Sequence, residues 1–197
     1  MASIKLQGDT SGELTISAPA VAGTNTLTLP ASTGTIVTTS DSSTITQGML
    51  ASNVAGTGPT FRAYMSTNLT LATGVQTKAP LNTEEWDTNS NYDNATNYRF
   101  TPTVAGYYIF TGAAFGSIAT TARFGVSVYK NGGPASWDFN NGLTFDGGGS
   151  VVVSTILYAN GSSDYFELYL LQNQGSNATI VSDRGNTWFS GSLIRSA

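Results

Sequence analysis

The chain has 197 residues, which is enough for one sizeable core with or without a small additional module. Charged residues make up 10% and the formal net charge is −4, so the composition excludes a basic surface for nucleic acid or anionic lipid. The content of 40% hydrophobic and 11% aromatic residues argues against disorder, and the lack of cysteine excludes a disulfide framework.

The first ten residues, MASIKLQGDT, contain no apolar stretch of the kind that forms a secretory signal. No part of the chain approaches the roughly 18 uninterrupted apolar residues of a membrane helix. The sequence therefore predicts a protein made without an export signal and without membrane insertion. Assembly into a virus particle, followed by lysis, would still bring such a protein outside the cell.

The N-terminal part predicts short strands, because apolar residues alternate in ELTIS (13–17) and in TNTLTLP (24–30). Residues 1–40 hold too few apolar side chains to fold alone, so we expect a small β segment that packs on other copies of the chain or on a particle protein. Residues 41–58 are rich in Ser, Thr and Gly and read as a linker, within which SSTITQGMLASN (42–53) is the best candidate for a short helix.

Longer strands are expected from residue 59 to the end, where apolar residues recur with a period of two. Asn-Gly pairs at 131–132, 141–142 and 160–161 are typical of turns between such strands. Since no helix-length connection separates the strands, the sequence predicts an all-β, antiparallel sandwich. The strand candidates lie at 106–112, 122–132, 150–161, 163–173 and 186–194.

One stretch, FTPTVAGYYIF (100–110), resembles the signature of the C1q globular-head family, whose jelly roll is shared with tumour necrosis factor. The resemblance extends over residues 59–197 and implies a jelly roll for this region. It is carried by Phe61 and Tyr64 in the first strand, by Phe100, Pro102, Gly106, Tyr108 and Phe110 in the signature, and by Phe189 and Gly191 in the last strand.

The strand within this signature is apolar on both faces. Tyr108 and Phe110 share one face, while Tyr107 and Ile109 share the other. This pattern predicts that the opposite sheet buries one face and a neighbouring subunit buries the other. The resemblance implies that the assembly is a homotrimer, since domains of this family are typically trimers.

The stretch PLNTEEW departs from the family pattern, with Leu81-Asn82 where the family usually has Phe-Asn. Members of the family sometimes bind Ca²⁺ near the trimer axis. No ligand position for Ca²⁺ can be assigned in this sequence, and no other cofactor is expected.

The N-terminal stretch GDTSGELTISAPAVAGTNTLTLPASTGTIVTT (8–39) resembles a segment of bacteriophage tail-fibre and appendage proteins. The resemblance rests on the order of its Gly, Ala-Pro and Leu-Pro positions. It implies that residues 1–40 join the chain to another protein of the phage particle or form a short trimeric stalk.

Catalytic chemistry has few candidates here, because the chain has neither His nor Cys and no phosphate-binding glycine loop. The carboxylates Glu84, Glu85, Asp87 and Asp93 cluster in sequence and could bind calcium or serve a glycosidase, or they could form a solvated acidic loop. The solvated loop is the simpler interpretation, so we expect a protein that is not an enzyme.

Two stretches are expected to form surface loops that contact a host glycan or protein. EEWDTNSNYDN (84–94) and SWDFNNGLTFDGGGS (136–150) combine aromatic with hydrogen-bonding side chains. A Trp in such a loop could also lie under the loop itself or in a subunit seam. The candidate contact residues are Trp86, Asp87, Tyr92, Trp137 and Asp138.

Together these features predict a trimeric structural protein on the surface of a phage particle, in a fibre, spike or head appendage that attaches to the host. The first alternative is a protein that decorates or cements the capsid, which the short chain favours. The second alternative is a polysaccharide-degrading spike enzyme.

Overall fold

The computed structural model describes residues 3–7, 10–17, 58–118, 122–143 and 148–197, and the single residues 21, 23, 24, 26, 31 and 56. The chain divides into two units, Met1–Thr44 and Ile45–Ala197, and each is presented here by itself. Most of the strand expected over 24–30 and all of the helix candidate over 42–53 lie outside the described residues. The limits expected at residues 40 and 58 stay predictions.

The first unit contains a β-hairpin of β1 (Ser3–Gln7) and β2 (Glu13–Ser17), which confirms the strand expected at 13–17. Ile4 lies opposite Ile16, and Leu6 is on the same face because side chains alternate along a strand. These three side chains are exposed, whereas Lys5 forms an ion pair with Glu13 at 2.8 Å on the other face. A single two-stranded hairpin is only marginally stable in water. No other described residue of this unit packs on its apolar face.

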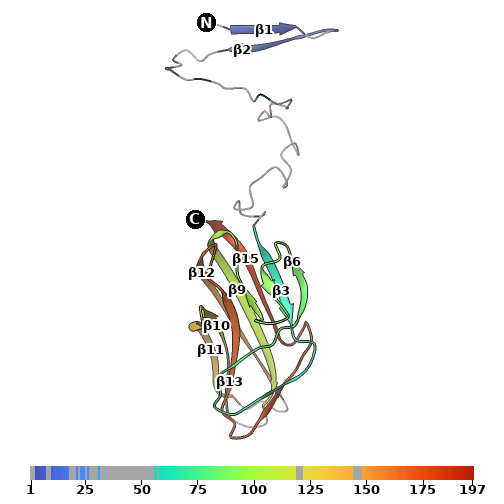
Figure 1. Cartoon of the computed structure of the whole chain (residues 1–197), viewed down its shortest axis with the longest axis vertical. Coiled ribbons are helices and arrows are strands. Elements are labelled where there is room, and N and C mark those ends of the chain that lie inside the picture. The colour runs from blue at the N-terminus through green and yellow to red at the C-terminus, as the bar shows by residue number, and fades with distance from the viewer. Residues whose placement is uncertain are drawn as a thin grey trace. The chain divides into compact units, whose positions relative to one another are not determined.

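The second unit contains a seven-stranded sheet in which every pairing is antiparallel (Figure 1). Its order is β4-β14-β9-β15-β3-β6, and β12 pairs with β9 along the whole length of both strands. The strands are β3 (Thr60–Tyr64), β4 (Leu69–Leu71), β6 (Thr83–Asp87), β9 (Ala105–Ser117), β12 (Gly149–Asn160), β14 (Ala178–Ile180) and β15 (Trp188–Ser196).

A six-stranded sheet faces the first, in the order β11-β10-β13-β8-β7, with β5 paired to β13. No helix occurs among the residues that the structure describes, and thus none there could span a membrane. The expected all-β, antiparallel class is confirmed. The strands are β5 (Thr77–Lys78), β7 (Tyr92–Asp93), β8 (Arg99–Phe100), β10 (Ala122–Lys130), β11 (Gly133–Leu143) and β13 (Phe166–Gln172).

The core between the sheets is rich in stacked aromatic rings. Phe61 of β3 stacks on Phe100 of β8 with ring centroids 4.3 Å apart, and Phe110 of β9 stacks on Phe166 of β13 at 4.2 Å. Phe189 of β15 contacts Phe61 edge-on at 5.2 Å. All five rings are fully buried, so the aromatic residues of both sheets interlock into one core.

Most of the signature residues serve this core, as expected. Gly191 is required because a Cβ there would lie 2.7 Å from the Phe61 ring and 2.8 Å from the Phe110 ring. Tyr64 is different: Phe61 and Ala63 are the buried residues of β3, while Tyr64 is half-buried on the opposite face. Tyr64 therefore carries the resemblance without belonging to the core, because the alternation of β3 turns it away from the second sheet.

Two of the three Asn-Gly pairs form turns. Asn131 and Gly132 have φ values of 54° and 78° and join β10 to β11, and Gly161 has a φ of 72° directly after β12. The pair at 141–142 instead lies within β11, so the turn expected there was wrong. Asn141 and Gly142 lie at a register shift between the pairing of Phe124 with Asn140 and that of Ala122 with Leu143, so they form an irregularity within β11.

The first and last strands of the jelly roll, β3 and β15, start and finish at the same end of the sheet. Ser192 of β15 pairs with Thr60, and Ser196 pairs with Gly106 near the start of β9 (Figure 1). The turn at Asn160 reaches the same end, because Asn160 pairs with Ala105. The chain therefore reaches the jelly-roll strands at the end where β15 finishes.

Candidate functional site

The outward face of the seven-stranded sheet carries a group of exposed apolar side chains, most of them near the end where β15 finishes. They lie on three neighbouring strands, β12, β9 and β15, and they point away from the core because of the alternation along each strand. Single exposed apolar residues are ordinary, but a contiguous patch marks an interaction surface. This set, called the association face below, comprises Tyr107, Ile109, Val152, Ile156, Tyr158 and Ile194.

The residues of the association face meet through the register of the strands. Tyr107 is directly opposite Tyr158, and their ring centroids are 5.5 Å apart in an edge-to-face arrangement. Ile109 is directly opposite Ile156, of which 56% is exposed. Such cross-strand pairs stabilise the sheet, and the Nζ of Lys130 lies 5.8 Å from the centre of the Tyr158 ring.

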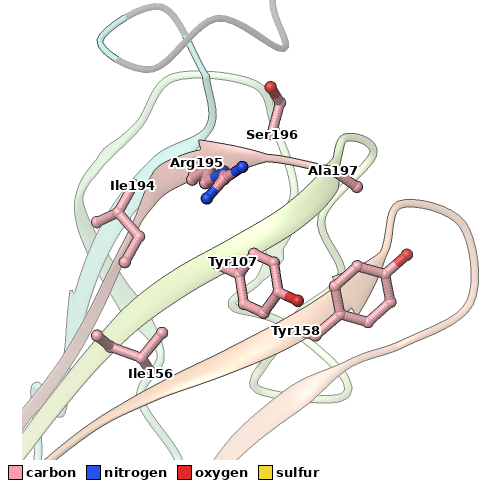
Figure 2. Close-up of a pocket in the computed structure, with 7 residues that line it drawn as sticks. All are labelled: Tyr107, Ile156, Tyr158, Ile194, Arg195, Ser196 and Ala197. Atoms are coloured by element: carbon pink, nitrogen blue, oxygen red, sulfur yellow. The ribbon is translucent and has the colours of Figure 1, made fainter.

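A pocket of about 510 Å³ opens at one end of this face. Figure 2 shows Tyr107 between Ile156 and Tyr158, with Ile194 and the last residues of the chain on the other side. Arg195 supplies the only charged side chain among its lining residues. The pocket lies at the end where β15 finishes, and its lining residues are Tyr107, Ile156, Tyr158, Ile194, Arg195, Ser196 and Ala197.

A second, smaller hollow of about 190 Å³ lies further along the same face. Trp86 and Ile109 form its apolar walls, and short side chains of β15, Ser190 and Ser192, form part of its floor. The indole Nε1 of Trp86 donates a weak hydrogen bond to Oγ1 of Thr60 at 3.4 Å. This hollow is lined by uncharged residues and has the size of a side chain rather than of a sugar chain.

Charged side chains are placed at the margin of the face, near Trp188. The guanidinium of Arg62 lies 4.4 Å from the centre of the Trp188 ring and 3.0 Å from a carboxylate oxygen of Glu85. Arg184 approaches Glu85 at 3.9 Å. An apolar centre with a charged margin is the usual pattern of a protein–protein interface.

The structure places the expected contact residues differently from the prediction. Trp86 and Asp87 belong to β6, and Trp137 and Asp138 belong to β11, so they lie in strands and not in loops. Arg62 pairs with Trp86 and Ser127 pairs with Trp137. These long-range pairings make strands of segments whose polar composition is typical of loops.

Tyr92 was wrongly expected on the surface. It is buried, its ring stacks on Phe61 at 5.0 Å, and its hydroxyl donates to the carbonyl oxygen of Leu81 at 3.3 Å. Burial raises the pKa of Tyr92 well above its usual value. Asp87 holds the backbone next to this ring, since its Oδ2 accepts a hydrogen bond from the backbone N–H of Tyr92 at 2.7 Å.

The acidic cluster is largely engaged in local structure. Asp93 accepts hydrogen bonds from the backbone N–H groups of Thr96, Ala95 and Asn97, which together with the Asn97 amide lower its pKa to about 2. Burial, and secondly the charge of Asp87, raises the pKa of Glu84. No group of three acidic, His or Cys side chains placed to hold a metal occurs among the described residues.

Sequence reasoning missed the contribution of β12 to the association face. The segment SVVVSTILYAN has apolar residues at both odd and even positions. In the structure Val151 and Val153 are buried, while Val152, Ile156 and Tyr158 are exposed. Both faces of this strand are apolar, as in β9. The arrangement as a whole is suited to binding another protein surface.

No protein-family model and no curated protein matches the chain. Among solved structures, murine APRIL at pH 5.0 aligns with a TM-score of 0.54 and 9% identity, over 68% of this chain and 98% of that one. Eiger TNF from S. frugiperda aligns with a TM-score of 0.54 and 6% identity, over 71% and 92%. PRD1 vertex protein P5 aligns with a TM-score of 0.51 and 15% identity, over 70% and 97%. At such identities the likeness shows the fold alone, and the expected jelly roll of the TNF type is confirmed.

Proposed function

We propose that the protein is a non-catalytic structural protein on the surface of a phage particle, assembled as a homotrimer through the association face. The observation that carries this proposal is the exposed apolar set on β9, β12 and β15, in which Tyr107 lies opposite Tyr158 and Ile109 opposite Ile156. Exposure of such a patch to water is unfavourable by about 25 cal/mol for each Å² of apolar surface, and association removes that surface from water.

The number of three copies comes from the resemblance to C1q-type domains. The geometry is compatible with it, because every copy presents the same face and a closed ring of copies leaves no face unpaired. The hollow beside Trp86 has walls that a side chain of a neighbouring copy could fill.

The N-terminal hairpin is proposed to join the assembly to another protein of the particle. Ile4, Leu6 and Ile16 form an exposed apolar face on a hairpin that has no core of its own. The sequence resemblance of residues 8–39 to phage tail-fibre segments supports this role.

The jelly roll is proposed to attach the particle to its host. Each contact can be weak, because several copies on one particle bind together with high avidity. Capsid decoration is the second candidate, and one observation favours it: PRD1 P5, which shares the fold, is by its name a vertex protein. Polysaccharide cleavage is the least favoured of the three candidate functions, because Glu85 is held by an ion pair and Asp87 by backbone hydrogen bonds.

A density map of the intact particle, with this chain located in it, tests the proposal. A trimeric knob at the tail or on an appendage supports attachment, and one seated on the capsid shell supports decoration. A chain that is absent from the particle overturns the proposed function.

A further inference from the structure

The outward face of the six-stranded sheet carries a cluster of aromatic rings from three strands. Tyr129 of β10 stacks on Tyr169 of β13 with ring centroids 3.9 Å apart and an angle of 21° between the rings. Trp137 of β11 lies 6.1 Å from Tyr129 and 5.1 Å from Phe139. These four residues are called the ring surface.

The strand register brings the rings to this face. Ser127 pairs with Trp137 on one side and with Tyr169 on the other, so the three side chains point the same way. Val126 and Val128, the neighbours of Ser127, are buried in the core on the opposite side. The ring surface therefore points away from the core and lies on the other sheet from the association face.

Two further contacts hold the rings in place. Phe139 lies over Gly125, where any Cβ would collide with the Phe139 ring. The guanidinium of Arg123 covers the same ring at 3.7 Å. Trp137 nevertheless keeps 43% of its surface exposed, so a fixed aromatic side chain is offered to solvent.

The polar groups of the ring surface are not used within the described chain. The hydroxyl of Tyr169 and the indole N–H of Trp137 have no hydrogen-bond partner there. Tyr129 is buried beneath its neighbours, and this burial, with the neighbouring tyrosine second, raises its pKa. Among the nearby charges, Lys78 forms an ion pair with Glu167 at 2.8 Å.

The two outward faces expose different kinds of side chains, so we expect them to bind different classes of molecule. The association face exposes the aliphatic side chains Ile109, Val152 and Ile156, which suit close packing against protein. The ring surface combines flat rings with free hydroxyl and N–H groups. A sugar ring has one face of C–H groups and a rim of hydroxyls, and it matches that combination.

We propose that the ring surface binds carbohydrate, with a sugar ring stacked on Trp137 and its hydroxyls bonded to Tyr169. The inference rests on the proposed function, in which the jelly roll meets the host surface, and it names a glycan as the contacted molecule. It also divides the two tryptophans: Trp137 contacts glycan, while Trp86 lies in the hollow of the association face.

The test uses the full chain on an immobilised array of bacterial O-polysaccharides, capsular polysaccharides and neutral hexaoses. We expect the wild type to bind a subset of the array. Trp137→Ala should bind that subset about tenfold more weakly, Trp137→Phe should retain most of the binding, and Tyr169→Phe should lose part of it. Circular dichroism shows that each variant is folded.

Val75→Ala is the control, since Val75 is 52% exposed, lies just before β5 and belongs to neither the ring surface nor the association face. Its glycan binding should equal that of the wild type. No binding by the wild type to any glycan, or equal binding by Trp137→Ala, would overturn the inference. Recognition of a host protein in place of glycan would overturn it as well. Those results would not change the mass of the assembly or its place on the particle. The proposed function would fail only if the mass is not that of a trimer or if the chain is absent from the particle surface.

Discussion

Tyr107 and Tyr158 lie directly opposite each other on β9 and β12, with their rings 5.5 Å apart and facing away from the core. Each follows or precedes a residue whose side chain is buried or half-buried on the inner side, so the pair belongs to the outer surface of a packed sheet. The pair belongs to the surface through which we expect the chain to associate, at the end where β15 finishes.

The first prediction concerns the mass of the assembly. Light scattering of the wild type should give about three times the chain mass of 20.5 kDa. Ile156→Glu should reduce the mass to that of a single chain, because a carboxylate buried in the seam without a partner costs several kcal/mol.

Val75→Glu is the matched control for that variant. Val75 is as exposed as Ile156, at 52% against 56%, but lies just before β5 and outside the association face. It should leave the trimeric mass unchanged. A folded wild-type monomer would show that the association face was assigned wrongly.

The second prediction concerns the N-terminal hairpin. Removing residues 1–40, or replacing Ile4 and Ile16 together by Ser, should leave the mass of the assembly unchanged while the protein no longer joins the particle. Quantitative blotting of purified particles measures this. Lys5→Gln on the opposite face serves as the control, because an exposed ion pair contributes little. Normal incorporation of the truncated protein would refute the attachment role of this segment.

The third prediction tests a signature glycine. Gly191→Ala should lower the free energy of unfolding by about 1–3 kcal/mol, because its Cβ would press on Phe61 and Phe110 in a filled core. Gly185→Ala is the control, since no atom lies within 4 Å of a Cβ built there. Urea titrations of both variants should separate them, and equal midpoints would contradict the packing argument.

The fourth prediction concerns Asp93 and pH. Its pKa falls from 3.8 to about 2 on folding, because the carboxylate accepts hydrogen bonds, first from the backbone of Thr96 and next from the Asn97 side chain. A lowered pKa means that the carboxylate stabilises the fold above pH 3.8 and that this contribution is lost as the pH falls toward 2.

Asp93→Asn should therefore be less stable than the wild type at pH 6, and the difference in urea midpoint should vanish near pH 2. Asp138→Asn in β11 is a control for the removal of one negative charge. A difference that persists unchanged at low pH would show that the hydrogen bonds of Asp93 do not depend on its charge.

The sequence alone determined the class of the fold and much of the core. Strict alternation in β9 separates Tyr108 and Phe110 from Tyr107 and Ile109 whatever the strand packs against, because successive side chains point to opposite faces. Local signals of this kind also located the turns at 131–132 and after Asn160.

The tertiary structure alone decided where the surface residues lie. Trp86 and Trp137 look alike in sequence, yet pairing with Arg62 places one on the first sheet and pairing with Ser127 places the other on the second. Asn141–Gly142 became part of β11 for the same reason, since pairing with β10 resumes beyond them at Leu143 and leaves them at a register shift. Such pairings join residues far apart in the chain, and a local pattern carries no information about them.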